Sequence, residues 1–169
     1  MTFVIISLLL FNSCNKVNIG INNVGAIFES DENRANARMN QILTAIKSKD
    51  SDILKSLFSK KALTEAINFD SDINFLFNFI QGDIVSWELN GWPSDESIEY
   101  GKSSLMIRFG VIINTDKDNY DLFVVDYNVD TINPDNEGIY MIEISKVGNC
   151  NSHLSWQERL YAGIHSPKE

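Results

Sequence analysis

The acidic residue with the clearest chemical potential is Asp126, near the end of an alternating apolar segment. It follows Leu122 and Val124 at a spacing of two, which places its carboxylate on their face of a predicted strand. A carboxylate among apolar side chains has a raised pKa and can act as a general base. Arg108, in the neighbouring predicted strand, could pair with it. The alternative is a structural Asp at a strand end, solvated or ion-paired with Arg108, and the sequence favours this alternative.

Glu143 is a second candidate of the same kind, because it follows Ile139 and Met141 at a spacing of two. The same catalytic and structural interpretations apply to it, and the structural one is again favoured. Neither acidic residue belongs to a recognisable catalytic motif, since GxSxG, P-loop, GxGxxG and CxxC patterns do not occur. The sequence therefore carries no signature of hydrolase, nucleotide-binding or redox chemistry.

The segment DYNVDTINPDNE, residues 126–137, resembles the ligand frame of a calcium loop. Asp126, Asn128 and Asp130 occupy its first, third and fifth positions, and Glu137 occupies the twelfth. Thr131, however, stands where such a loop requires Gly, and the segment begins inside a predicted strand. Turn-forming residues explain the same composition as a hairpin loop. The sequence therefore predicts a turn here, and it predicts no metal or other cofactor.

An apolar run near the N-terminus, Phe3–Phe11, indicates where the chain is sent in the cell. It is much shorter than the roughly 20 residues that span a bilayer. The sequence Phe11-Asn12-Ser13-Cys14 resembles a degenerate lipoprotein cleavage box. We expect residues 1–13 to be a signal peptide, Cys14 to carry a lipid, and residues 14–28 to form a flexible tether. The alternative is a buried strand with Cys14 as a core thiol.

The second cysteine and the two histidines show no catalytic or metal-binding context. Cys150 is predicted to be an inert thiol, although a disulfide between Cys150 and Cys14 would exclude lipidation. His153 and His165 lack ligand partners at metal spacing, so both are expected at the surface.

The composition fits one acidic globular domain. Of 169 residues, 44% are hydrophobic and 11% aromatic, which is enough to form a packed core. The 23 acidic and 14 basic residues give a formal net charge of −9. No basic stripe is present to neutralise phosphates, so nucleic acid is not an expected partner. Charged partners should instead be cationic groups or metal ions.

Residues 29–169 are predicted to form a single domain whose first half is helical. The first helix begins behind a candidate cap at Ser30 and carries apolar residues at helical spacing. The last, which follows Asp70-Ser71-Asp72, is apolar on all sides and is therefore expected to be buried. Helices are predicted at residues 29–50, 51–58, 60–67 and 73–80.

From residue 84 the apolar period changes to two, which predicts an antiparallel meander. A short helix around Trp156, Leu160 and Tyr161 is predicted to end at Gly163 and to pack back on the domain. Helices followed by such a sheet indicate an α+β fold, with the N-terminal helices packed on one face of a curved antiparallel sheet. The predicted strands cover residues 84–89, 103–114, 120–130 and 139–147, with 96–101 as a short strand or loop.

The longest predicted strand has one core face and one face that is too apolar for free exposure. Alternate residues from Leu105 to Ile113 are predicted to be core, while Met106, Arg108 and Ile112 lie on the opposite face. We interpret this second face as a pocket lining or as a homodimer surface.

The sequence as a whole resembles a family of small bacterial lipoproteins, of the domain-of-unknown-function 5104 type. The resemblance rests on the three opening helices, the curved sheet and the phrases NGWPSDESIEYGK, NPDNEGIYMIEI and WQERLYAGIHSP. It covers roughly residues 29–167. It implies a cystatin-like, nuclear-transport-factor-two-like cone with a cavity between sheet and helices, and it implies extracytoplasmic anchoring. It brings no known reaction.

The resemblance leaves two functions open. Ketosteroid-isomerase-like enzymes of this superfold place an Asp base in the cone, a role that Asp126 would fill with Arg108 nearby. A binding protein would instead hold a small apolar or amphiphilic ligand there. The sequence favours binding, of such a ligand or of another envelope protein, by a lipid-anchored extracytoplasmic module of the cell membrane. The pocket candidates are Trp87, Met106, Arg108, Asp126 and Glu143.

Overall fold

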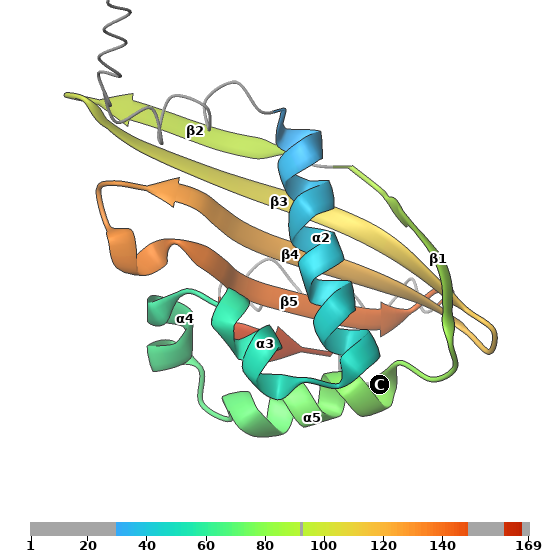
Figure 1. The fold of residues 1–169 in the computed structure, drawn as a ribbon. Coiled ribbons are helices and arrows are strands. Elements are labelled where there is room, and N and C mark those ends of the chain that lie inside the picture. Colours follow the sequence, from blue (N-terminus) through green and yellow to red (C-terminus); the bar gives the residue numbers. More distant parts are fainter. Residues whose placement is uncertain (1–29, 92, 149–160, 167–169) are drawn as a thin grey trace, which may run out of the picture.

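The computed structural model describes residues 30–91, 93–148 and 161–166 (Figure 1). Four helices come first: α2 (Asp31–Ser48), α3 (Ser51–Leu57), α4 (Lys60–Glu65) and α5 (Phe69–Phe79). The strands follow: β1 (Ile84–Leu89), β2 (Ser94–Glu99), β3 (Lys102–Thr115), β4 (Asn119–Asp130), β5 (Gly138–Lys146) and β6 (Gly163–His165), with a 3₁₀ turn η2 (Pro134–Asn136) before β5. Among these residues, no helix combines the length and apolar composition needed to cross a membrane.

Helix α2 forms as its sequence predicts. The Ser30 hydroxyl accepts a hydrogen bond from the Asn33 N–H at 3.2 Å, and Asp31 lies in the positively polarised first turn. The helix ends at Lys49, which adopts the left-handed conformation with φ of 51°. The apolar residues predicted to share one face of this helix are all buried: Ala35, Met39, Ile42, Ala45 and Ile46.

The shorter helices are also delimited by their caps. Asp50 accepts a hydrogen bond from Ile53 N–H to begin α3, and Ser59 accepts one from Ala62 N–H to begin α4. Helix α5 starts at Phe69, four residues before the predicted start at residue 73, because its first turn includes the acidic Asp70–Asp72 segment. The prediction that this helix is buried on all sides is wrong, since Phe75 is 40% exposed.

The six strands form one open sheet in the order β1-β3-β4-β5-β6, and β2 also pairs with β3. β1 and β2 lie along the same edge of β3, one against each half of that long strand. The α+β prediction is confirmed, but the sheet is mixed, because β6 runs parallel to β5. The helix predicted around Trp156, Leu160 and Tyr161 lies almost wholly outside the described residues, and from Gly163 the chain forms β6.

The helices cover one face of the sheet, with α2 crossing the long strands (Figure 1). Burying this apolar face is the main favourable term in the folding of such a domain. The predicted core positions of β3 and β4 are confirmed, because Ile107, Phe109 and Leu122 are fully buried in one cluster with the helices. Other fully buried members of this cluster are Met39, Ile42, Ile73, Leu76, Val111, Ile113, Tyr120, Val124, Ile142 and Ile144.

A β-bulge between β4 and β5 changes which residues face the helices. Val125 lies opposite Met141, but Asp126 lies opposite Ile139, so Tyr140 is the extra residue on β5. The prediction that Ile139, Met141 and Glu143 share a face is therefore wrong. Ile139 shares the core face with Asp126, whereas Met141 and Glu143 belong to the outer face.

Gly138, at the start of β5, lies where the sheet meets the α3–α4 connection. The Ser59 N–H donates to the Ile139 carbonyl at 2.9 Å, which brings the two backbones into contact. A Cβ on Gly138 would lie 2.8 Å from Ser59 N and 3.0 Å from Leu57 O, and the residue has φ of +119°. Both the close approach and the backbone conformation therefore require glycine at this position.

We predict that Gly138→Ala destabilises the domain by about 2–4 kcal/mol, because a clash adds to the unfavourable φ. Gly101→Ala is the matched control, since Gly101 also has a positive φ but has nothing within 4 Å of the added Cβ. It should cost about 1 kcal/mol. Urea unfolding of both variants tests this, and equal losses would show that the close approach to Ser59 is unimportant.

Candidate functional site

Asp126 points into the core face of β4, as its sequence spacing predicts. It is fully buried, and its Oδ2 accepts hydrogen bonds from Arg38 Nε and from Asn128 Nδ2, both at 2.9 Å. Arg38 is on α2 and also donates to Gln41 on the same helix. The Arg38–Asp126 ion pair therefore connects α2 to the central strand of the sheet.

Burial raises the pKa of Asp126 above its ordinary value of 3.8, and the Arg38 guanidinium only partly opposes this shift. Its second oxygen, Oδ1, is buried and has no hydrogen-bond partner in the described part of the chain. A general base must touch its substrate, and a fully buried carboxylate beneath an arginine is not in contact with solvent. The arrangement is that of a structural ion pair.

Arg108 does not pair with Asp126, which corrects the pairing expected from the sequence. The register places Ile107 opposite Asp126, so Arg108 projects from the other face of the sheet. Its Nη2 lies 2.9 Å from Asp95 Oδ2, on β2. The Arg108 Nε is buried and has no hydrogen-bond partner among the described residues.

The other predicted pocket residues do not converge on one cavity. Met106 lies on the outer face beside Arg108 and is half-buried. Trp87, on β1, lies opposite Ile113 and packs against the buried core on the other face. Glu143 is 2% exposed on the outer face, where it lines a small pocket of about 160 Å³ that also touches Gly110. Asp126 itself shares its face of the sheet with members of the buried core cluster, such as Val124 and Ile139.

The residues of the predicted hairpin loop make the hydrogen bonds of a turn. Asp130 accepts hydrogen bonds from the N–H groups of Ile132 and Asn133 and from Asn136 Nδ2. Glu137 accepts one from the Asp130 N–H, while Asp126 belongs to the Arg38 pair. The residues that the structure describes contain no cluster of three or more metal-binding side chains.

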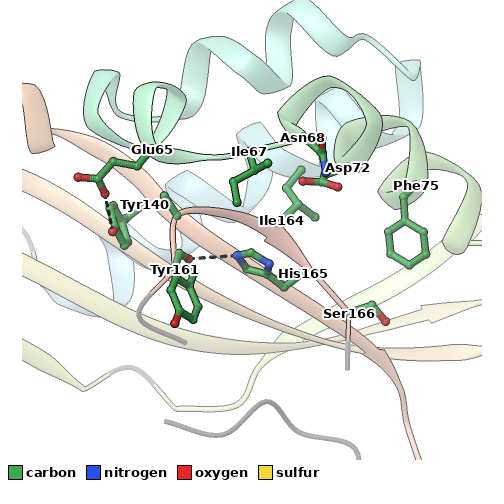
Figure 2. A pocket seen from close by; sticks show the side chains of 11 residues that line it. Glu65, Ile67, Asn68, Asp72, Phe75, Tyr140, Tyr161, Ile164, His165 and Ser166 are labelled. Carbon is green, nitrogen blue, oxygen red and sulfur yellow. Dashed lines mark hydrogen bonds between the residues drawn. The ribbon is translucent and has the colours of Figure 1, made fainter. Parts of the chain in front are cut away.

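A pocket that the sequence did not predict lies where α5 meets the end of the sheet (Figure 2). Its volume is about 620 Å³. It is bordered by the end of α4, by α5, by Tyr140 on β5 and by the segment from Tyr161 to Ser166. The lining residues are Glu65, Ile67, Asn68, Asp72, Phe75, Tyr140, Tyr161, Ala162, Ile164, His165 and Ser166.

The pocket combines an apolar lining with a few polar groups. Tyr140 donates its hydroxyl hydrogen to Glu65 Oε2 at 2.8 Å, and this bond helps to raise the pKa of Tyr140, already raised by burial, to about 12. His165 Nε2 lies 3.1 Å from the Tyr161 carbonyl oxygen. Asp72 lies across from these pairs, beside Phe75 (Figure 2). Partial burial raises the pKa of Asp72, and His165 opposes that shift.

The sequence could have pointed to only part of this pocket. The available signal is Phe75. It belongs to the helix that is apolar on all sides, and in a small domain such a helix must expose some of its apolar side chains. His165 was expected at the surface, and it is half-buried in the pocket wall. Its place depends on β6, which no sequence pattern predicted. The remaining sequence candidates, Cys14, Cys150 and His153, lie outside the described residues.

We predict that Asp126→Asn becomes more stable relative to the natural protein as pH rises. Because the pKa of Asp126 is higher in the folded than in the unfolded protein, protonated Asp126 stabilises the fold, and this contribution is complete below pH 3.8. It is lost as pH rises through the folded-state pKa. Asn keeps an acceptor for Arg38 but does not titrate. Urea unfolding between pH 4 and pH 8 measures the difference, with Asp95→Asn as the control for net charge. A difference that is flat or reversed would contradict the prediction.

Comparison with known proteins identifies the family. A family model described as Domain of unknown function (DUF5104) matches residues 41–147, which is more than half of the 169 residues. The match begins in the second half of α2, includes the other helices, and continues through strands β1 to β5. It ends before the tail phrase WQERLYAGIHSP. No curated protein matches the chain. The chain therefore belongs to the DUF5104 family.

Proposed function

We propose that this domain is a binding module that holds a small molecule with an apolar body in the pocket between α5, β5 and β6. The observation that carries the proposal is the pocket itself. About 620 Å³ is within the range of sites for small organic ligands, which are usually apolar hollows with a few polar groups. Its rim exposes apolar side chains that a soluble domain would normally bury: Ile67 is 93% exposed and Phe75 is 40% exposed.

Catalysis by Asp126 is the less favoured function. The residue is fully buried, its ion pair is with Arg38, and it does not line the large pocket. Glu65, which does line the pocket, already accepts a hydrogen bond from the Tyr140 hydroxyl. The apolar hollow therefore supports binding better than it supports isomerase-like chemistry.

We also propose that the domain is anchored outside the cytoplasm by a lipid on Cys14, and that it adopts the cone-like fold of the nuclear-transport-factor-two-like proteins. The anchor is supported by the apolar run and cleavage box that precede Cys14. Two observations support the cone-like fold. The helices lie on one face of the sheet, and the strands contain bulges, which bend a sheet.

The anchor is tested by labelling cells with an alkyne-bearing fatty acid while they produce the full chain. We expect the label on the natural protein in the membrane fraction, and its loss together with release from membranes in Cys14→Ser. The control is Cys150→Ser, which leaves Cys14 free of any disulfide with Cys150. Labelling that persists in Cys14→Ser would overturn the proposed anchor.

The pocket is tested by screening small aromatic and aliphatic compounds by NMR against the full chain with labelled methyl groups. Ligands of the pocket should shift the methyl signals of Ala162 and Ile164, which line it. Val85 and Ile98, which are exposed but lie on β1 and β2, report non-specific contact with apolar surface. Compounds that shift only these control signals would argue against a binding function for the pocket.

A further inference from the structure

We propose that the ligand of this pocket carries a cationic group, an organic ammonium attached to an apolar body, which Asp72 and the aromatic rings of the pocket lining recognise. This inference rests on the proposed binding function and names the chemical class of the ligand. The charges and the aromatic rings that line the pocket support it.

The first support is the charge of the lining. Asp72 and Glu65 contribute two carboxylates, and His165 is the one basic side chain among the described lining residues. The chain as a whole has a formal net charge of −9, so its field also favours cations over anions. Within the described lining, an anionic ligand would meet both carboxylates and no Lys or Arg side chain.

The second support is the state of the two carboxylates. Glu65 already accepts a hydrogen bond from Tyr140, whereas Asp72 accepts none from the residues that the structure describes. Desolvation raises the pKa of the Asp72 carboxylate, and His165 opposes this shift only in part. An ammonium group would supply both the missing opposite charge and N–H donors.

The third support is the set of aromatic rings in the pocket lining, where Tyr140 contacts Glu65 and Phe75 follows Asp72 on α5. Phe75, Tyr140 and Tyr161 line the same pocket, and Figure 2 shows Phe75 beside Asp72. The faces of such rings attract cations, and they do so more strongly where water is excluded. The Tyr140 ring already has one cation near it, because Lys61 Nζ lies 5.7 Å from its centroid.

His165 is compatible with a cationic ligand when it is neutral. A ring nitrogen that contacts a carbonyl oxygen must carry the hydrogen, so the contact with Tyr161 assigns the proton of the neutral ring to Nε2. The other nitrogen, Nδ1, is then an acceptor, which suits an N–H donor and not an anion.

The test compares three probes that share one phenyl body: 2-phenylethylammonium, 2-phenylethanol and 3-phenylpropanoate. Their affinities for the full chain are measured at pH 7.5 from the methyl shifts of Ala162 and Ile164. We expect the cation to bind about tenfold more tightly than the alcohol, and the anion to bind most weakly. This ratio corresponds to about 1.4 kcal/mol, the scale of one partly buried charge pair with a ring contact.

Asp72→Asn tests the role assigned to the carboxylate. It should weaken binding of 2-phenylethylammonium about fivefold or more and leave that of 2-phenylethanol unchanged. The matched control is Asp70→Asn, which removes the same charge from the first turn of the same helix. Asp70 is 81% exposed, pairs with Lys55 and does not line the pocket. Both variants should therefore lose similar helix stability, which thermal unfolding checks.

The outcomes separate this inference from the proposed function. Equal affinity for the cation and the alcohol would leave the pocket as a binding site but overturn its preference for ammonium groups. Equal losses in Asp72→Asn and Asp70→Asn would attribute the preference to overall charge, and would overturn the role of Asp72. If no probe shifts the pocket signals, the inference fails, and the wider screen described above then decides whether the pocket binds small molecules at all.

Discussion

The apolar face of β3, β4 and β5 must be removed from water, and the way the helices cover it determines the rest of this domain. Helix α2 crosses the strands while α5 packs at the end of the sheet, so residues distant in sequence, such as Met39, Ile73 and Phe109, join one cluster. Burial of this kind is proportional to area and has no preferred direction. The directional features of the fold are therefore local ones: helix caps at Ser30, Asp50 and Ser59 and the close backbone contact at Gly138.

The Arg38–Asp126 pair is the main polar exception inside this cover. Moving a carboxylate out of water is costly, and one arginine with one amide does not fully compensate, because the pKa of Asp126 remains raised. Such a pair adds little net stability compared with apolar side chains. Its geometry nevertheless requires α2 to lie over one particular position of β4, and the hydrogen bond from Asn128 reinforces that position. The pair can thus select one arrangement of helix on sheet among several apolar alternatives.

The large pocket forms where this cover ends. Strand β6 extends the sheet beyond β5, and α5 lies against it without filling the space above Ile164 and His165. The β4–β5 bulge contributes to the same site, because the extra residue it inserts is Tyr140, whose hydroxyl reaches Glu65 on α4. This one bulge therefore changes which residues of β5 face the helices, and it also supplies an aromatic side chain to the pocket wall.

The sequence by itself determined the order of the four helices and of strands β1, β3, β4 and β5, the cap of the first helix at Ser30, and the core faces of β3 and β4. These follow from periodicity and capping, which depend on neighbours a few residues away. It also placed Asp126 inside. Only the tertiary structure decided that Arg38 is its partner, that Glu143 lies on the outer face, and that Asp72, Tyr140 and His165 line one pocket. Bulges, a three-residue parallel strand and contacts between distant elements depend on pairing across the whole chain, and no local pattern encodes them.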